Sequence, residues 1–295
     1  MAQSLRQSQR RLAWVFLAPS LALFAVVALY PLMQTFLLSL TSTNAFESAA
    51  PKFIGLENFR RLAVDADFRA ALKNTLVFTV ISVTLETALG LAVALFLNME
   101  FRGRALLRAA LLVPWAIPTV VAARIWNYVL NESYGVLNDL LQYKLHIISE
   151  PIAWTANYGY AMASVIAADV WKTTPFVAIL VLAGLQTIPG ELYEAAEVDG
   201  AGAARRLTNV TLPLLTPTLA VMLIFRTMDA LRIFDLIWIM TSGQFGTQSI
   251  GTFDYRTLIV NGDLGYGSAV SVAIFAVLGI FIAAYLWIFR LEEKR

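Results

Sequence analysis

Charged side chains interrupt the long apolar stretches of this sequence. They are Glu86, Arg124, Asp169, Lys172, Arg226, Asp229, Arg232 and Asp235. Residues three apart on a helix are neighbours, so Arg226 can pair with Asp229. Arg232 and Asp235 have the same spacing. Ionisable groups in apolar segments usually face a bundle interior or a cavity. Two interpretations remain open: structural ion pairs, or groups that line the path of a polar substrate.

A second group of residues combines flat ring faces with hydrogen-bonding groups, as a site for a sugar requires. The candidate positions are Trp115, Thr119, Asp169, Thr173 and Phe176. A site built to hydrogen-bond hydroxyl groups discriminates strongly through them. Pro114, Pro118 and Pro175 fall in the same stretches. Proline in an apolar helix is tolerated where a cavity or a neighbour satisfies the freed backbone groups. The competing interpretation is that Trp115 lies at the membrane–water interface and Phe176 packs between helices.

A short acidic segment lies in a polar gap between two long apolar runs, from Pro189 to Gly200. Proline suits the first turn of a helix. Glu191 and Glu194 suit the same turn because the helix dipole favours acids there. Glycine suits the left-handed residue that ends a helix. The sequence therefore predicts a capped acidic helix with a defined contact face. A solvated loop helix without a partner is the alternative.

Enzymatic chemistry finds little support in the residues. The chain has no Cys, which excludes thiolate nucleophiles and thiolate metal sites. No G-x-x-x-x-G-K-[ST] phosphate loop occurs, so we expect no ATP hydrolysis by this chain itself. The one histidine, His146, has no partners at metal-ligand spacing, and we expect neither a catalytic residue nor a metal site. Nothing in the surroundings of Asp169 and Asp229 supports an aspartic catalytic pair.

The composition indicates which elements must position these residues. Of 295 residues, 59% are hydrophobic and 14% charged, whereas soluble domains are about 45–50% apolar and about 25% charged. The apolar runs are long enough to cross about 30 Å of hydrocarbon, and in lipid such spans must be helices. We predict about six transmembrane helices, at roughly 12–40, 74–97, 105–130, 158–188, 214–240 and 268–289. The first follows a basic start, but it is too long for a signal peptide and lacks a cleavage site, so we expect it to be retained.

Basic residues near the span ends predict the orientation, because they accumulate on the cytoplasmic side. With both termini inside, the cytoplasmic segments hold Arg6, Arg10, Arg11, Arg102, Arg104, Arg108, Arg205, Arg206, Arg290, Lys294 and Arg295. The first outer loop is the exception, since it carries five basic residues. The shorter loops favour cytoplasmic termini.

The acidic segment also matches a known pattern. Glu194-Ala195-Ala196, Asp199-Gly200-Ala201 two residues later, and then Leu212-Pro213 resemble the EAA loop of binding-protein-dependent ABC importer permeases. Other segments look like the carbohydrate-uptake branch of that family, and most like the first of its two permease subunits, similar to maltose, trehalose and glycerol-phosphate permeases. These segments are 53–59, 74–76, 113–118, 169–172, 182–189 and 235–238. Unlike the best-known maltose member, this chain has no large inserted outer domain.

The resemblance implies an all-α integral membrane protein with the type I ABC importer permease fold. In that family the EAA loop forms a cytoplasmic coupling helix, which inserts into a cleft on an ATPase subunit and transmits its closure to the membrane helices. The positions that match the pattern are Glu194, Ala195, Ala196, Asp199, Gly200 and Pro213. No cofactor is then expected on this chain, and ATP and Mg belong to the partner ATPase.

The resemblance also implies partners and a location. We expect a second homologous permease subunit, two ATPase subunits, an extracytoplasmic solute-binding protein, a carbohydrate substrate and membrane lipid. A net charge of +2 gives no reason to expect nucleic acid. The location is the cytoplasmic (inner) membrane of a prokaryote. We divide the chain into a cytoplasmic N-terminus over 1–11 and a permease domain over 12–295, with an outer loop at 41–73 and a coupling loop at 189–213.

The predicted function is therefore a permease subunit of an ATP-driven carbohydrate importer, which forms half of the translocation path and works by alternating access. One alternative is an importer of glycerol phosphate or another anionic solute, with Lys172 and Arg226 as substrate ligands. A second is a membrane enzyme that acts on a lipid-linked sugar.

Overall fold

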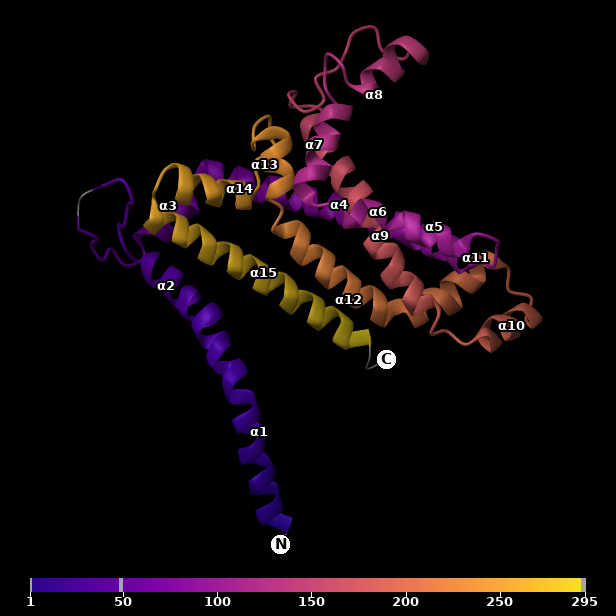
Figure 1. The fold of residues 1–295 in the computed structure, drawn as a ribbon, viewed down its shortest axis with the longest axis horizontal. Helices are drawn as coiled ribbons and strands as arrows, with labels where there is room; N and C mark the ends of the chain where they lie inside the picture. The colour runs from indigo at the N-terminus through magenta and orange to yellow at the C-terminus, as the bar shows by residue number, and fades with distance from the viewer. Residues whose placement is uncertain (1, 48–49, 293–295) are drawn as a thin grey trace. The chain divides into compact units, whose positions relative to one another are not determined.

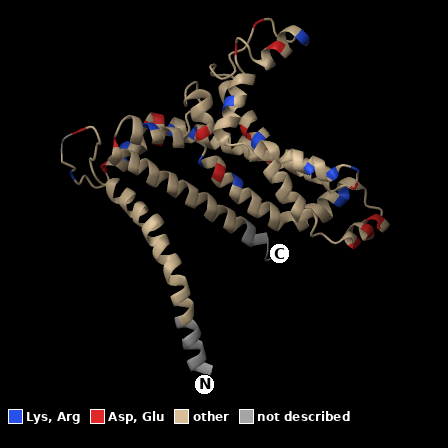
Figure 2. Ribbon diagram, in the orientation of Figure 1, with Lys and Arg blue, Asp and Glu red and all other residues tan. Residues whose placement is uncertain are grey.

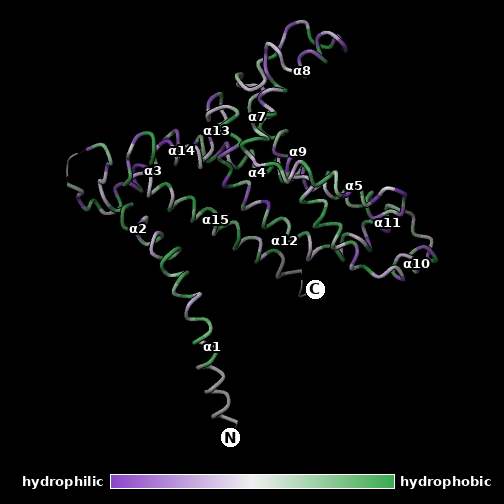
Figure 3. The backbone as a smooth tube through the Cα atoms, viewed as in Figure 1, coloured by the Kyte–Doolittle hydropathy of each residue, from purple (hydrophilic) through white to green (hydrophobic). Residues whose placement is uncertain are grey.

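Helices form the regular secondary structure of the computed structural model, which describes residues 2–47 and 50–292 (Figure 1). The chain divides into two compact units. Residues 1–65 and 254–276 form the first, and residues 66–253 and 277–295 form the second. The apolar runs of the sequence lie in long helices such as Ala66–Asn98 and Leu264–Ile288, and Figure 3 colours the backbone by hydropathy.

The first unit begins with α1 (Ala2–Phe24), which continues through a π-helical turn over Ala25–Leu29 into α2 (Tyr30–Leu38). The chain then turns back to α3 (Glu57–Val64). Asn58 fastens this return, because its buried side-chain amide donates to the carbonyl oxygens of Ser39 and Thr41, both at 2.9 Å. The start of α3 is therefore anchored to the residues that follow α2.

The rest of the first unit comes from far along the chain. It contains the end of α14 (Ile250–Tyr255), a π-helical turn over Arg256–Val260 and the start of α15 (Leu264–Glu292). Asp254 on α14 accepts a hydrogen bond from Ser271 Oγ on α15 at 2.8 Å. Burial raises the pKa of Asp254 to about 6, and the hydrogen bond from Ser271 opposes part of that rise.

The second unit is built around α4 (Ala66–Asn98), α9 (Ala161–Leu185) and α12 (Leu212–Leu231). α4 packs closely along α9. At the crossing, a Cβ on Gly90 would lie 2.8 Å from Val177 Cβ and 3.2 Å from the amide nitrogen of Ala178. The two helices therefore approach so closely because position 90 has no side chain.

Shorter helices connect these three. α5 (Arg104–Leu111), α6 (Val113–Ala116) and α7 (Thr119–Val129) follow α4, and α8 (Val136–Asp139) with a π-helical turn over Leu140–Lys144 leads towards α9. After α9 come α10 (Gly190–Val198), α11 (Ala203–Arg206) and a π-helical turn over Leu207–Thr211. α13 (Asp235–Thr241) follows α12.

Two apolar clusters hold the second unit together. One joins α4, α7, α9 and α13 through buried residues such as Phe78, Val165 and Ile237. The other joins α4, α9 and α12 through Leu97, Val181 and Met222. Because both clusters include α4 and α9, this helix pair is the framework on which the remaining helices are placed.

The prediction of about six membrane-spanning helices is confirmed. Five helical stretches of the described residues are long and apolar enough to cross a membrane: Leu12–Leu38, Ala66–Asn98, Ala161–Leu185, Ala203–Leu231 and Leu264–Ile288. The pair Arg104–Ala116 and Thr119–Val129 makes a sixth when counted as one broken span. Two predictions need correction. The third span keeps its predicted bounds but is bent by 92° between Ala116 and Thr119, and the fifth span ends at Leu231 instead of Met240. Both corrections arise from helix breaks that shape the candidate site.

Candidate substrate pocket and coupling loop

The first helix break lies between α6 and α7, at Ile117 and Pro118. Proline disfavours helical geometry in the residue before it, and Ile117 is accordingly extended, with φ −70° and ψ 130°. The following helix turns by 92° and starts at Thr119. One of the predicted path residues therefore stands at the beginning of a new helix.

The second break separates α12 from α13. Leu231 ends α12, and Phe234, the residue before α13, has φ −138° and ψ −66°. Asp235 occupies the first turn of α13, where the helix dipole favours an acid. Non-helical backbone at membrane depth is tolerated where it is buried in protein or lines a cavity, so two breaks in one unit suggest a cavity beside them.

A polar pocket does lie at these breaks, and we call it the helix-break pocket. Its volume is ≈ 150 Å³, and its walls come from α6, α7, α9, α12 and α13. The residues that line it are Trp115, Thr119, Asp169, Lys172, Thr173, Arg226, Asp229, Ala230, Arg232, Ile233, Phe234, Asp235 and Leu236. Discontinuous helices of this kind form substrate sites in membrane transporters.

Four of the five predicted path residues line this pocket, although they come from three helices. The fifth, Phe176, stacks on Trp115, with ring centroids 5.7 Å apart and planes inclined by 16°. Thr173 donates its hydroxyl to the backbone oxygen of Asp169 at 2.7 Å. The Trp115 indole is 47% exposed, so it offers a ring face, while Phe176 supports it.

Arg226, which lines the pocket, is the centre of an ion network. Its Nε and one terminal nitrogen donate to the two carboxylate oxygens of Glu86, at 2.6 and 2.8 Å. It also donates to Asp169 at 3.2 Å and to Asp229 at 2.6 Å. The Arg226 and Glu86 side chains are 2% and 0% exposed. A buried ion pair needs such saturated geometry to offset its desolvation.

The two predicted ion pairs on the fifth span have different outcomes. Arg226 does contact Asp229, at the three-residue spacing. Among the residues that the structure describes, no ion pair joins Arg232 to Asp235. The reason is the helix break between them, which removes the regular spacing.

Sequence reasoning missed the long-range partners of Arg226. Glu86 lies 140 residues away and Asp169 lies 57 residues away. Spacing along one helix cannot reveal such pairs, but a single charged residue in an otherwise apolar span is a signal that a partner exists elsewhere.

The predicted acidic helix is present as α10, with Pro189 directly before it and Gly200 after it at φ +74°. Acidic residues gather on α10 (Figure 2). Of the positions that match the EAA pattern, Glu194, Ala195, Asp199, Gly200 and Pro213 are exposed and Ala196 is half-buried. Pro213 lies in the first turn of α12. A contact face is therefore available to a partner.

Polar contacts connect α10 to the following helix. Tyr193 Oη lies 3.1 Å from Thr211 Oγ1, and Arg206 forms an ion pair with Glu197 at 3.3 Å. Thr211 is buried at the start of the long span that ends at Leu231. These contacts link α10 to the helix that carries Arg226.

The prediction that metal chemistry has no place here stays a prediction. In residues 2–47 and 50–292, no three His, Cys, Asp or Glu side chains are grouped to hold a metal ion. His146 lies after α8, away from the helix-break pocket.

Comparison with known proteins agrees with these features. Residues 86–295 match the family described as "Binding-protein-dependent transport system inner membrane component". The trehalose/maltose transport system permease protein MalF of Thermococcus litoralis is 42% identical over 297 residues, with 99% of this chain and 98% of that protein covered. The trehalose transport system permease protein SugA of Mycobacterium tuberculosis is 40% identical, with coverage of 96% and 90%. The sulfoquinovosyl glycerol transport system permease protein SmoG of Agrobacterium fabrum is 38% identical, with coverage of 96% and 92%.

A solved structure has the same fold. A bacterial ABC transporter involved in the import of the acidic polysaccharide alginate contains a chain that superposes with a TM-score of 0.84 at 24% identity, with 98% of this chain and 99% of that chain covered. ATP hydrolysis in this system resides on a partner subunit, and the expected multi-pass position in the inner membrane follows from the family. The broken spans, the exposed acidic helix and the match over 86–295 together place this chain in the family of binding-protein-dependent ABC importer permeases.

Proposed function

We propose that this chain forms half of the path of a neutral carbohydrate through an ABC importer. The observation that carries the proposal is the convergence of Trp115, Thr119, Asp169 and Thr173 on one pocket at two helix breaks. Ring face, hydroxyl groups and carboxylate are the groups that a sugar site requires. The volume, ≈ 150 Å³, is below the roughly 300–1,000 Å³ of ordinary ligand pockets, which suits a half-site that a second permease completes.

The charges around the pocket favour a neutral substrate. Three lining residues are acidic and three are basic, so their formal charges cancel: Asp169, Asp229, Asp235, Lys172, Arg226 and Arg232. Arg226 already donates to three carboxylates and is 2% exposed. Its role as a ligand for an anionic solute therefore has no support in the geometry.

The relatives support a carbohydrate. Two of the permeases reported above are described as transporting trehalose, and one of these also as transporting maltose. SmoG is described as transporting sulfoquinovosyl glycerol, which keeps an anionic sugar as the second candidate. Lys172 and Arg232 are then the basic groups at the pocket that would face a sulfonate or phosphate.

The assembly we propose contains this chain, a second homologous permease, two ATPase subunits and an extracytoplasmic binding protein, with both termini of this chain in the cytoplasm. ATP-driven closure of the two ATPase subunits displaces α10, and they act on its residues Glu194 to Gly200. The spans rock and expose the helix-break pocket to one side of the membrane at a time. Such coupling requires different contacts in the two states, since equal affinity shifts no equilibrium.

The test is ATP-driven uptake by the complete purified assembly in proteoliposomes, with its binding protein supplied. We expect uptake of labelled trehalose or maltose that excess unlabelled sugar blocks and glycerol phosphate does not. Preferential uptake of glycerol phosphate or a sulfonated sugar would favour the anionic alternative. Turnover of a lipid-linked sugar by this chain without any ATPase would replace the transporter proposal with the enzyme alternative.

A further inference from the structure

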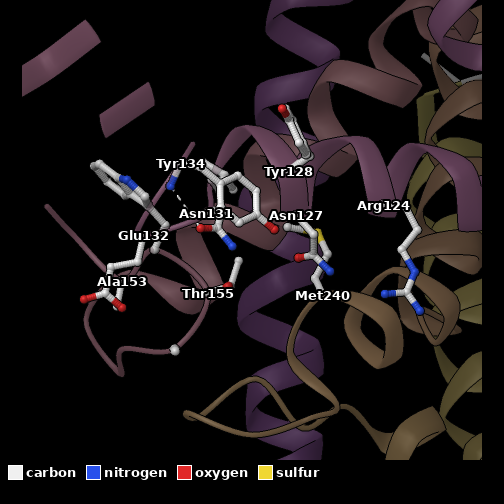
Figure 4. Close-up of a pocket in the computed structure, with 12 residues that line it drawn as sticks. Arg124, Asn127, Tyr128, Asn131, Glu132, Tyr134, Ala153, Thr155 and Met240 are labelled. Atoms are coloured by element: carbon white, nitrogen blue, oxygen red, sulfur yellow. Dashed lines mark hydrogen bonds between the residues drawn. The ribbon is translucent and has the colours of Figure 1, made fainter. Parts of the chain in front are cut away.

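A larger cavity lies at the other end of α7, and we call it the loop pocket. Its volume is ≈ 440 Å³, within the roughly 300–1,000 Å³ typical of ligand sites. Its walls are the second half of α7, the turn that follows it, the segment 153–156 and Met240 of α13 (Figure 4). All of these parts belong to the second unit.

The walls of the loop pocket are held by Asn138, which is 4% exposed. Its amide nitrogen donates to the carbonyl oxygens of Glu132 at 3.1 Å and Ile152 at 2.9 Å. Its Oδ1 accepts from the Ile152 amide at 3.2 Å and from Trp154 Nε1 at 2.9 Å. One buried side chain therefore fastens the turn after α7 to the opposite wall, so the pocket is preformed.

Asn127 presents an unused acceptor at this pocket. Its amide nitrogen donates to the carbonyl oxygen of Ile239 at 2.9 Å, which fixes the orientation of the amide. Its Oδ1 is buried and has no hydrogen-bond partner within the described part of the chain. Buried polar atoms are nearly always hydrogen-bonded, so this oxygen lacks a donor, which a ligand hydroxyl supplies once a neighbouring side chain shifts to admit it. Figure 4 shows the Asn127 amide among the side chains that line the cavity.

The surrounding groups suit a polyhydroxylated ligand. Tyr128 and Tyr134 lie with ring centroids 5.3 Å apart and are 60% and 63% exposed, so ring faces are available. Arg124, Glu132 and Thr155 add a cation, a carboxylate and a hydroxyl. In a sugar site, ring faces pack against the sugar ring while donors and acceptors bind its hydroxyl groups. A small ionic ligand would leave most of these pocket groups without a contact.

The loop pocket and the helix-break pocket share two walls. On α7, Thr119 lines the helix-break pocket and Asn127 lines the loop pocket, a separation of about 12 Å along a helix. On α13, Asp235 lines the first and Met240 lines the second. The two cavities therefore follow one another along the same pair of helices.

We propose that the loop pocket is a second carbohydrate site, in series with the helix-break pocket, which holds the sugar at one end of its path. The proposal rests on the proposed function, because it concerns the same class of substrate. It adds a site on this chain and the residue that reads the ligand hydroxyl, Asn127.

The absence of Cys in the chain permits a direct test. Thr155→Cys places one thiol in the loop pocket, and Ser149→Cys places one elsewhere on the same loop as a control. The complete assembly carries each variant in proteoliposomes, and the rate of maleimide labelling of this chain is measured by mass spectrometry. Trehalose and maltose are the probes, with glycerol as the matched solute. We expect both sugars, and not glycerol, to slow labelling at position 155 and to leave position 149 unchanged.

Variants assign the protection to the loop pocket. Asn127→Leu and Tyr134→Ala should raise the trehalose concentration for half-protection by about three- to tenfold, the effect of one hydrogen bond or ring contact. Tyr143→Ala removes a tyrosine of similar exposure from the same loop, outside this pocket, and should have no effect. Thr119→Val alters the helix-break pocket alone and should leave protection intact.

Three outcomes would overturn the proposal. They are no protection at position 155, protection that survives both Asn127→Leu and Tyr134→Ala, and protection that depends on Thr119 instead. If uptake of trehalose or maltose by the wild-type assembly is normal in any of these cases, only the second site fails. If the assembly transports no carbohydrate, the proposed function fails, but protection at position 155 that Asn127→Leu weakens would still support a sugar site at the loop pocket.

Discussion

Arg226 and Glu86 form a two-point ion pair between α12 and α4, with hydrogen bonds of 2.6 and 2.8 Å and almost no exposure of either side chain. Asp169 of α9 joins the same guanidinium. The pair and Asp169 therefore link the three helices that build the second unit, at the wall of the helix-break pocket. The pair accounts for Glu86 and Arg226 without assigning either charge to the substrate.

Replacement of Arg226 alone should lower the free energy of unfolding more than replacement of both Arg226 and Glu86. Arg226→Met leaves Glu86 and Asp169 buried without a counter-charge, and we expect a loss of about 3–5 kcal/mol in the free energy of unfolding. Arg226→Met combined with Glu86→Gln should recover part of that loss, because one uncompensated charge is gone. Thermal denaturation of the two single variants and the double variant in detergent measures the coupling. Additive losses would show that the pair is energetically unimportant.

The sequence predicts the membrane spans and the residues of the candidate site better than it predicts the helix breaks that bring those residues together. Apolar runs identified the spans, because hydrocarbon thickness fixes their length. The ring faces and hydrogen-bonding groups of the side chains predict the path residues, and Trp115 and Thr173 do line one pocket. The break after Leu231 was not predicted, since Ile233, Phe234 and Leu236 continue the apolar pattern of a helix. Pro118 gave a local signal for its break, whereas the second break depends on packing that no local pattern encodes.

The close contact of α4 and α9 should not tolerate a side chain at position 90. Gly90→Ala places a methyl group 2.8 Å from Val177 Cβ, and overpacking of this kind costs about 1–3 kcal/mol. Gly279→Ala is the matched control, because a Cβ at that position in α15 meets nothing within 4 Å. Thermal denaturation should show a lower midpoint for Gly90→Ala alone. Equal midpoints would mean that the two helices can separate at no cost.

The buried carboxyl group of Asp254 should make stability depend on pH. Its pKa is raised from 3.8 to about 6 by burial, and its Oδ1 lacks a hydrogen-bond partner among the described residues. Between about pH 4 and 6 the folded chain holds this proton more tightly than the unfolded chain, so the free energy of unfolding falls as pH rises through that window. Asp254→Asn should flatten this slope and stabilise the protein at pH 7, by on the order of 1–3 kcal/mol.

Denaturation midpoints between pH 4 and 8 check the Asp254 prediction. Asp139→Asn removes an exposed carboxylate and is the control for a change of surface charge. An unchanged pH slope in Asp254→Asn would show that the carboxyl group is ionised in the folded protein at no cost.

The ring face of Trp115 should contribute to uptake more than its packing suggests. Trp115→Ala removes the ring that stacks on Phe176 at the helix-break pocket. We expect the substrate concentration for half-maximal uptake to rise about tenfold, because the sugar loses the ring face that it packs on and that aligns its hydroxyl groups. Trp287→Ala removes a tryptophan that is 68% exposed on α15, and it should leave uptake unaltered. Similar losses in both variants would indicate that tryptophan anchors the helices and does not read the substrate.

A reversal of charge on the coupling helix should abolish uptake without loss of the fold. Glu194→Lys changes an exposed position of the EAA pattern, so we expect loss of uptake and of ATPase attachment while the permease remains inserted. Glu191→Lys makes the same change on the same helix outside the matched positions, and it should retain uptake. Equal loss in both variants would show that the total charge of α10 matters and the position of Glu194 does not.

The central claim is that α10 is the part of this chain on which the motor subunit acts, and cross-linking from its exposed face tests that claim most directly. Ala195→Cys introduces the sole thiol of the chain, and a short thiol-reactive photo-cross-linker attached to it reports which subunit lies against it. The account predicts a cross-link to the ATPase subunit in the intact assembly, with a yield that changes when ATP is bound. Full labelling at position 195 with no cross-link to the ATPase, in an assembly that still transports, would contradict it.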